Sequence, residues 1–194
     1  MDVTSAVGSV LAAFGLSGAA GLNAWIPLLA TAILGRAGVI DLGAPYDGLE
    51  STPVIVLLAV AFAADFVGDK VPVVDHVLHA AGTVVHPVAG ALVFAGSTSV
   101  ASDLPPVVGL LAGALVSGSL HAGRATVRPM STASTAGAGN PLLSLGEDVS
   151  SAVLTALAVL VPILAVVLLI AGAYGLYRAW RRLGDVNRGR PART

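Results

Sequence analysis

Residues 75–97, which read DHVLHAAGTVVHPVAGALVFAGS, are the stretch that decides the fold of this chain. Their purely apolar part, residues 88–95, is too short to cross a membrane, because a helix needs about 20 residues to span the hydrocarbon core. A crossing must therefore include His79 and His86. Ionisable side chains at that depth are costly and by default mark function. The segment predicts a membrane protein with a polar interior.

The composition also indicates a membrane protein. Of the 194 residues, 56% are hydrophobic and only 11% are charged, whereas soluble domains carry about 25% charged residues. The 23 glycines suit membrane helices, which approach closely through small side chains. Cysteine is absent, which excludes a disulfide framework, a thiolate metal site and a cysteine nucleophile. The start, Met1-Asp2-Val3, lacks the basic region of a cleaved signal peptide, so we expect the first apolar run to stay in the mature protein.

Five apolar runs predict an all-α polytopic transmembrane helix bundle. The runs are residues 6–34, 54–67, 75–97, 107–120 and 149–177. Pro27 predicts a break or kink in the first run, over residues 21–27, because proline removes a backbone donor and clashes with the preceding turn. Splitting the first or the last run gives six crossings, so we expect one transmembrane domain of five or six helices over residues 1–177.

The stretch between the last two runs, residues 121–148, holds charged residues, prolines and a run of Ser, Thr, Ala and Gly. We expect it to form either a surface loop or a partly re-entrant segment that lines a cavity, where irregular backbone can be satisfied.

Two similar segments allow an inverted repeat with broken helices. Residues 17–24 read SGAAGLNA and residues 117–122 read SGSLHA, and both close a span rich in small residues. Three crossings separate them, so equivalent helices would run antiparallel. Repeats of this kind are typical of transporters, whose sites lie at unwound helices near the bilayer midplane.

Most of the basic residues lie in the C-terminal tail, residues 178–194. They are Arg178, Arg181, Arg182, Arg188, Arg190 and Arg193. Cytoplasmic flanks of membrane helices are rich in Lys and Arg, and Tyr174 and Tyr177 resemble an interfacial anchor. We therefore expect a disordered cytoplasmic tail that sets topology, with no nucleic-acid partner.

Asp75, His79 and His86 fall within about 40° of one another on an ideal helix and form a stripe about 16 Å long. Such a stripe can relay protons, because His titrates near neutrality. It could also bind a divalent metal, the single cofactor for which the sequence offers a candidate site. Alternatively, Asp75 and His76 lie at the headgroup level, and His86 alone is deep, where a backbone carbonyl or Asn23 satisfies it.

Two pairs of opposite charge share a spacing of one helical turn: Asp65 with Asp69, and Arg124 with Arg128. Facing each other across a bundle, the pairs would neutralise one another, as buried membrane charges usually must. Unpaired arginines would instead suit an anionic substrate, because guanidinium matches carboxylate and phosphate geometry.

Catalytic motifs are absent from the sequence. There is no G-x-S-x-G, no H-E-x-x-H and no phosphate-binding loop. An intramembrane hydrolase would need a nucleophile beside His86 or His121. We interpret Glu147 and Asp148 as partners of the helix dipole at the start of the last span.

Three segments carry a family resemblance: residues 21–29 (GLNAWIPLL), 69–75 (DKVPVVD) and 87–91 (PVAGA). They resemble a bacterial family of small integral membrane proteins catalogued as domain of unknown function 4126. The resemblance extends over nearly the whole chain up to the arginine tail. It implies a multi-pass protein of the bacterial inner membrane in which the DK-x-P-x-x-D connector matters, but it supplies no substrate.

The sequence therefore predicts a transporter or channel for a small solute or ion. The alternatives are a non-transporting membrane scaffold or assembly partner, and a membrane-embedded enzyme acting on a lipid. The expected pathway residues are Asn23, Asp65, Asp69, Lys70, Asp75, His79, His86, Arg124 and Arg128. Glycine-rich helix faces further predict a homo-oligomer in the lipid bilayer.

Overall fold

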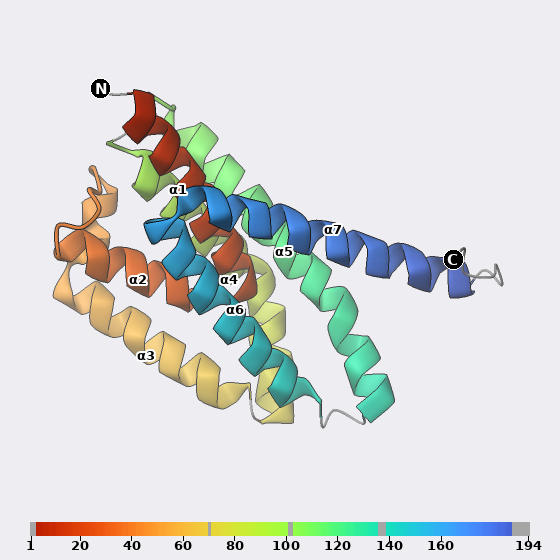
Figure 1. Cartoon of the computed structure of the whole chain (residues 1–194). Helices are drawn as coiled ribbons and strands as arrows, with labels where there is room; N and C mark the ends of the chain where they lie inside the picture. The colour runs from red at the N-terminus through yellow and green to blue at the C-terminus, as the bar shows by residue number, and fades with distance from the viewer. Residues whose placement is uncertain (1–2, 70, 101–102, 136–138, 188–194) are drawn as a thin grey trace.

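The computed structural model describes residues 3–69, 71–100, 103–135 and 139–187, and these residues contain helices but no strand. The elements are α1 (Val3–Leu22), α2 (Trp25–Arg36), the short 3-10 helix η1 (Tyr46–Glu50), α3 (Thr52–Gly68), α4 (Pro72–Thr98), α5 (Pro106–Thr135), α6 (Asn140–Leu160) and α7 (Pro162–Asn187). The predicted all-α fold is confirmed (Figure 1).

Four stretches of the described helices are long and apolar enough to cross a membrane: Thr4–Leu22, Val77–Thr98, Pro106–Thr126 and Asn140–Leu160. The protein is therefore a multi-pass membrane protein. Three further apolar helices are shorter than a full crossing: Trp25–Arg36, Thr52–Gly68 and Pro162–Gly175. The structure thus differs from the predicted five or six spans, because the second apolar run forms only the 17-residue helix α3. The first and last apolar runs each divide at a helix break and keep one full-length span.

Both divisions lie next to a proline. The first run breaks at Asn23 and Ala24, within the predicted range, and Pro27 occupies the first turn of α2. The last run breaks at Val161, and Pro162 is the first residue of α7. Proline is tolerated in the first turn of a helix, where its missing N–H would have no intrahelical partner. The α7 helix then extends to Asn187 and includes residues 178–187, which the sequence assigned to a disordered tail.

The expectation of a loop or re-entrant segment over residues 121–148 is wrong for the residues that the structure describes. The α5 helix continues to Thr135, and α6 already begins at Asn140. The polar residues that suggested a loop lie on these helices, where Arg124, for example, bonds to the end of α1. The second member of the similar segments, residues 117–122, is therefore inside a continuous helix and has no break like that at Asn23.

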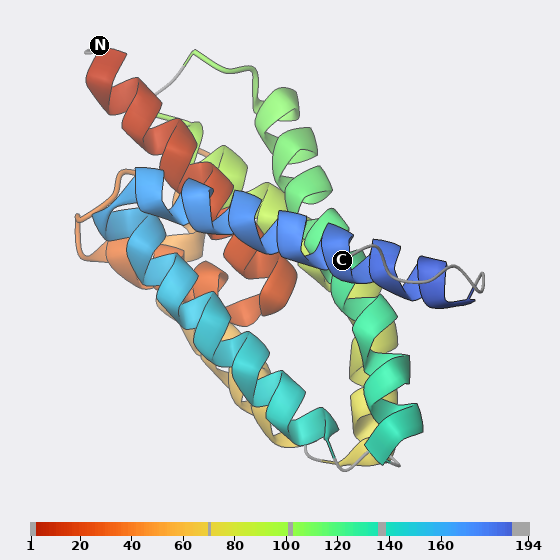
Figure 2. The same cartoon turned by 45° about the vertical axis from the view of Figure 1, so that its right-hand side comes forward.

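The α1 helix is at the centre of the structure and packs against α4, α5, α6, α7 and α2. Figures 1 and 2 show it entering the bundle from the N-terminus, while α7 projects beyond the other helices. Small residues allow the close approach: the Ser17 hydroxyl donates to the Gly90 carbonyl of α4 at 3.0 Å. A Cβ at Gly113 of α5 would collide with the Gly90 backbone and would lie 2.7 Å from the Phe94 Cβ.

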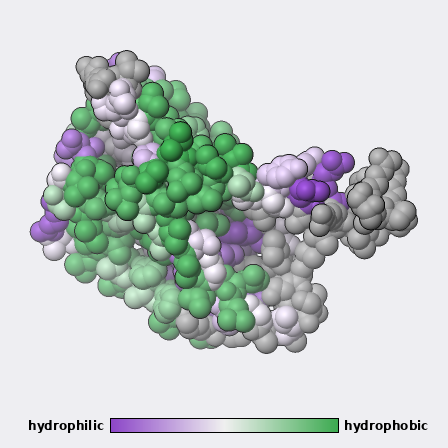
Figure 3. Space-filling model, viewed as in Figure 1, coloured by the Kyte–Doolittle hydropathy of each residue, from purple (hydrophilic) through white to green (hydrophobic). Residues whose placement is uncertain are grey.

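Most of the glycines at which an added Cβ would collide already contact another helix of the same molecule. A Cβ at Gly15, Gly18, Gly21, Gly90 or Gly113 would collide with a neighbouring helix of the same molecule. The outer surface is instead covered by large apolar side chains, and Figure 3 shows hydrophobic residues over much of the visible face. Contact with the lipid bilayer follows from this surface, whereas a homo-oligomer built through these glycine faces stays a prediction.

We predict that Gly113→Ala lowers the free energy of unfolding by about 2 kcal/mol, because the added methyl meets backbone that cannot move aside. Gly172→Ala on α7 is the matched control, since a Cβ there has no atom within 4 Å. The control should unfold like the wild type or slightly later, because alanine favours a helix. Unfolding by SDS titration, followed by circular dichroism, measures both. Equal stability of Gly113→Ala and the wild type would contradict the close α4–α5 contact.

Candidate functional site

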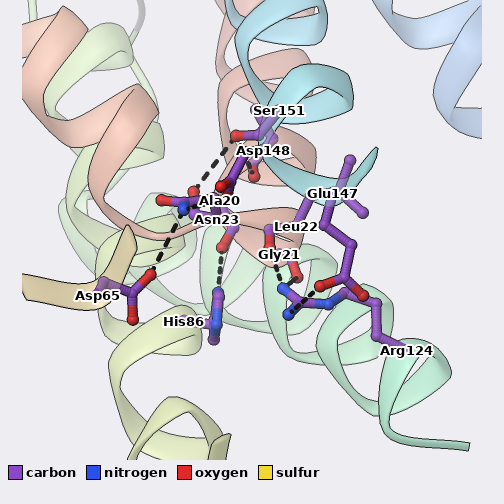
Figure 4. A network of polar contacts seen from close by, with 11 residues as sticks. Ala20, Gly21, Leu22, Asn23, Asp65, His86, Arg124, Glu147, Asp148 and Ser151 are labelled. Carbon is purple, nitrogen blue, oxygen red and sulfur yellow. Dashed lines mark hydrogen bonds and ion pairs between the residues drawn. The ribbon is translucent and has the colours of Figure 1, made fainter. Parts of the chain in front are cut away.

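The α1 helix ends inside the bundle, where its last carbonyls need partners. The last four carbonyl groups of any α-helix have no intrahelical donor of the regular pattern, and here Ala19, Ala20 and Asn23 are buried inside the bundle. In this chain, side chains from three other helices donate to them (Figure 4). The acceptors are the carbonyls of Ala19, Ala20, Gly21 and Leu22. The Ala19 carbonyl also accepts the backbone N–H of Asn23 at 3.0 Å.

Two of these carbonyls bind neutral side chains. The Ser151 hydroxyl of α6 donates to the Ala19 carbonyl at 2.9 Å, and Nδ1 of His86 on α4 lies 2.6 Å from the Ala20 carbonyl oxygen. Because a carbonyl oxygen can only accept, the proton of the neutral ring is on Nδ1. The expectation that a backbone carbonyl satisfies His86 is confirmed.

Arg124 of α5 binds the other two carbonyls. Its Nη1 donates to the Gly21 carbonyl at 3.2 Å and to the Leu22 carbonyl, while its Nη2 lies 2.8 Å from Oε2 of Glu147 on α6. The side chain is only 10% exposed. A cation is favourable at a helix C-terminus, where the backbone carries partial negative charge. Arg124 thus completes the end of α1 and joins it to α6.

Asn23 completes the start of α2. Its Oδ1 accepts from the backbone N–H groups of Trp25 at 2.9 Å and Ile26 at 3.2 Å, as an N-terminal cap does. Its Nδ2 donates to Oδ1 of Asp148 at 2.8 Å and, at 3.5 Å, to Oδ2 of Asp65. Both ends of the helix break are therefore bonded to side chains, and irregular backbone is tolerated in a membrane only under this condition.

A small cavity of about 20 Å³ lies at this break, and it has room for about one water molecule. The residues that line it are Leu22, Asn23, Asp65, Asp69, Leu78, His79, His86, Arg124, Glu147 and Asp148. We call the polar members of this set the break cluster. Among these lining residues four carry carboxyl groups and one carries a guanidinium group, so acidic groups are in excess.

Three histidine rings lie against one another beside the cavity. The ring centroids of His86 and His121 are 4.3 Å apart, and those of His79 and His121 are 5.1 Å apart. Gly82 leaves space for them, because a Cβ there would lie 2.9 Å from Cε1 of His121 and 3.0 Å from Cδ2 of His86. The stack joins α4 to α5 on the side where α1 ends.

The structure brings six of the nine predicted pathway residues to one cavity. They are Asn23, Asp65, Asp69, His79, His86 and Arg124. Lys70 lies outside the described residues, as do the side chains of Asp75 and Arg128. The predicted role of the DK-x-P-x-x-D connector as a charged gate therefore stays a prediction.

Glu147 and Asp148 were missed as members of the site. Their interpretation as dipole partners at a helix start is wrong, because α6 begins at Asn140 and both residues lie about two turns into it. Glu147 is instead the ion-pair partner of Arg124, in place of the predicted neutralisation by Asp65 and Asp69. Two adjacent acids inside a helix that is apolar enough to span a membrane were the signal for a buried site.

His121 was also missed as a pathway residue. It precedes Arg124 by three residues on α5, and on a helix this spacing places two side chains on one face. This spacing would have predicted that His121 and Arg124 share a face only if residues 121–124 had been predicted to be helical.

A metal site finds no support among the described side chains, which contain no group of three or more His, Asp or Glu residues placed to hold an ion. The rings of His86 and His121 stack face to face, and the ring of His79 is tilted by 36° against that of His121. Asp75, the third predicted ligand beside His79 and His86, has its side chain outside the described part.

We predict that Arg124→Gln costs about 3–5 kcal/mol of stability, because it leaves the Glu147 charge buried and uncompensated. Glu147→Gln should cost less, since Arg124 keeps its carbonyl acceptors. The double variant should be more stable than the sum of the two single losses predicts, by about 0.5–3 kcal/mol. SDS unfolding titrations of all four proteins give this coupling energy.

Arg36→Gln is the matched control for the arginine change. Arg36 is exposed and donates to the Thr52 hydroxyl, so its loss should cost less than about 1 kcal/mol. Strictly additive losses for Arg124→Gln and Glu147→Gln would contradict the ion pair.

Comparison with known proteins places the chain in a family. No curated protein and no solved structure gives a significant match to the sequence. The model of one protein family matches residues 10–182, which is most of the chain and includes the whole break cluster. The family is described as a domain of unknown function, DUF4126. The resemblance drawn from the sequence motifs is thereby confirmed, and the chain belongs to the DUF4126 family.

Proposed function

We propose that this protein transports or conducts a small ion, with the proton as first candidate, through the break cluster. The excess of acidic groups at the helix break carries the proposal. Four carboxyl groups and one guanidinium group line the described cavity wall. Several carboxylates close together in a protein interior repel one another, and bound protons or a bound cation relieve that cost.

The size of the cavity favours an ion over a larger solute. A space of about 20 Å³ holds one water molecule or a small desolvated ion. An organic solute would require the surrounding helices to separate. The ion-pair and hydrogen-bond contacts between Arg124 and α1, and between Asn23 and Asp148, oppose such separation.

The broken helix gives independent support. In many transporters, ions bind at discontinuous helices whose backbone ends are freed near the midplane. The helix is likewise discontinuous between Leu22 and Trp25. Its backbone ends are bonded to side chains, so the groups offered to an ion are the carboxyl groups of Asp65 and Asp148, both within hydrogen-bond range of Asn23.

A non-transporting scaffold is the second candidate, and the Arg124–Glu147 ion pair favours it. A pair of this kind can serve only to hold α5 and α6 to the end of α1. A lipid-modifying enzyme has less support, because the hydroxyls of Ser17, Ser117 and Ser151 all donate to backbone carbonyls and not to a histidine ring.

Ion flux into proteoliposomes tests the proposal. With a valinomycin-set potassium potential and entrapped pyranine, we expect the wild type to admit protons faster than protein-free vesicles. Asp65→Asn and Asp148→Asn should each lower the rate about tenfold, which corresponds to ~1.4 kcal/mol in the barrier. Asn keeps an acceptor oxygen at each position, so the bonds from Asn23 can persist.

Asp47→Asn is the matched control, because Asp47 lies exposed in η1, away from the break cluster. It should leave the flux unchanged, and all variants should match the wild type in thermal unfolding and elution volume. Sodium and potassium fluxes are measured on the same vesicles. A wild-type flux equal to that of empty vesicles for all three ions would overturn the proposal and favour the scaffold.

A further inference from the structure

A second, apolar site lies on the outer surface between α5 and α7. It is a groove of about 480 Å³, within the range of ligand-binding pockets. Leu115 and Ser119 of α5 form one wall, Leu169 and Ile170 of α7 form the other, and Phe14 of α1 contributes to the lining. Ser119 supplies the lone side-chain hydroxyl, so the groove offers almost nothing to a polar ligand. Its chemistry matches a hydrocarbon chain.

Basic residues of α7 follow the groove on the C-terminal side of its last lining residue. Ala173 is the last groove residue along α7, and Arg178 comes five residues later, about 7.5 Å farther along the helix. The Arg178 guanidinium carbon lies 5.9 Å from the ring centroid of Tyr174, and that of Arg181 lies 5.8 Å from the ring centroid of Tyr177. These cation–π contacts hold both arginines along α7.

Exposed tyrosines and arginines at the end of an apolar helix are typical of the level of lipid headgroups. Figure 3 shows hydrophilic side chains gathering along the projecting part of α7, beside the hydrophobic surface. The apolar groove and the basic segment therefore follow each other in the order of a lipid tail and its headgroup.

We propose that this groove binds one acyl chain of an anionic phospholipid, whose phosphate group is bound by Arg178 and Arg181. Charge complementarity selects the anionic lipid, because basic residues beside a membrane helix attract anionic headgroups. A zwitterionic lipid fills the groove equally well but lacks the net charge that the two arginines attract. This site is separate from the break cluster and does not depend on its function.

Electron paramagnetic resonance of spin-labelled lipids tests this site in reconstituted phosphatidylcholine vesicles. Labelled phosphatidylglycerol should associate with the wild type at least about fivefold more strongly than labelled phosphatidylcholine. Arg178→Gln/Arg181→Gln should reduce that ratio to about one while leaving the number of motionally restricted lipids unchanged.

Ser119→Phe should fill the groove and lower the number of restricted lipids for both labels. Ser150→Phe is the matched control, because Ser150 is exposed on α6 and does not line the groove; it should leave the number unchanged. Equal association of the two labelled lipids with the wild type, or an unchanged number in Ser119→Phe, would overturn the proposal. Formation of disulfide-linked dimers by Ser119→Cys would instead indicate that a second copy of the chain occupies the groove. Such a disulfide can join only the introduced cysteines, because the chain has no other cysteine.

Discussion

The bonds that satisfy the end of α1 are the constraint on which the rest of the structure depends. A helix that ends inside a bundle leaves carbonyl groups that cost several kcal/mol each if they are buried without a donor. Here His86, Arg124 and Ser151 supply the donors, and each comes from a different helix. The positions of α4, α5 and α6 around α1 are therefore fixed by polar chemistry at one level of the bundle, while small residues such as Gly90 allow the close approach.

The same constraint explains why charge collects at this level. Arg124 is favourable beside the partial negative charge of the α1 end, and Glu147 then compensates the guanidinium. The need to bond the end of α1 and to neutralise Arg124 accounts for these two charges. It does not account for Asp65 and Asp69, which line the same cavity without an arginine of their own among the described residues. These two acids are the groups on which the proposed ion pathway depends.

The correct predictions about this arrangement came from local signals in the sequence. Pro27 indicated a break near Asn23, and the short apolar run after His86 required that histidine to be buried. The helical course of residues 121–135 had no such signal, because its Ser, Thr, Gly and Arg residues also suit a loop. The acceptors of Arg124 lie more than 100 positions earlier in the chain. The roles of His121, Glu147 and Asp148 become readable only when the end of α5 and the start of α6 are placed correctly, and the expected loop over residues 121–148 hid them.

The positions of these donors along the sequence also limit the order in which the contacts at the end of α1 can form. Membrane helices insert one at a time and then associate, and α1 is the first of these helices to be synthesised. Its polar contacts with other helices remain incomplete until residue 151 has joined the bundle, because Ser151 is the last of the described side-chain donors along the sequence. A nascent chain that stops before α6 therefore lacks the carboxyl groups that bond to Asn23 and Arg124 at the break. The polar contacts around the end of the first helix are completed only when a helix synthesised much later joins the bundle.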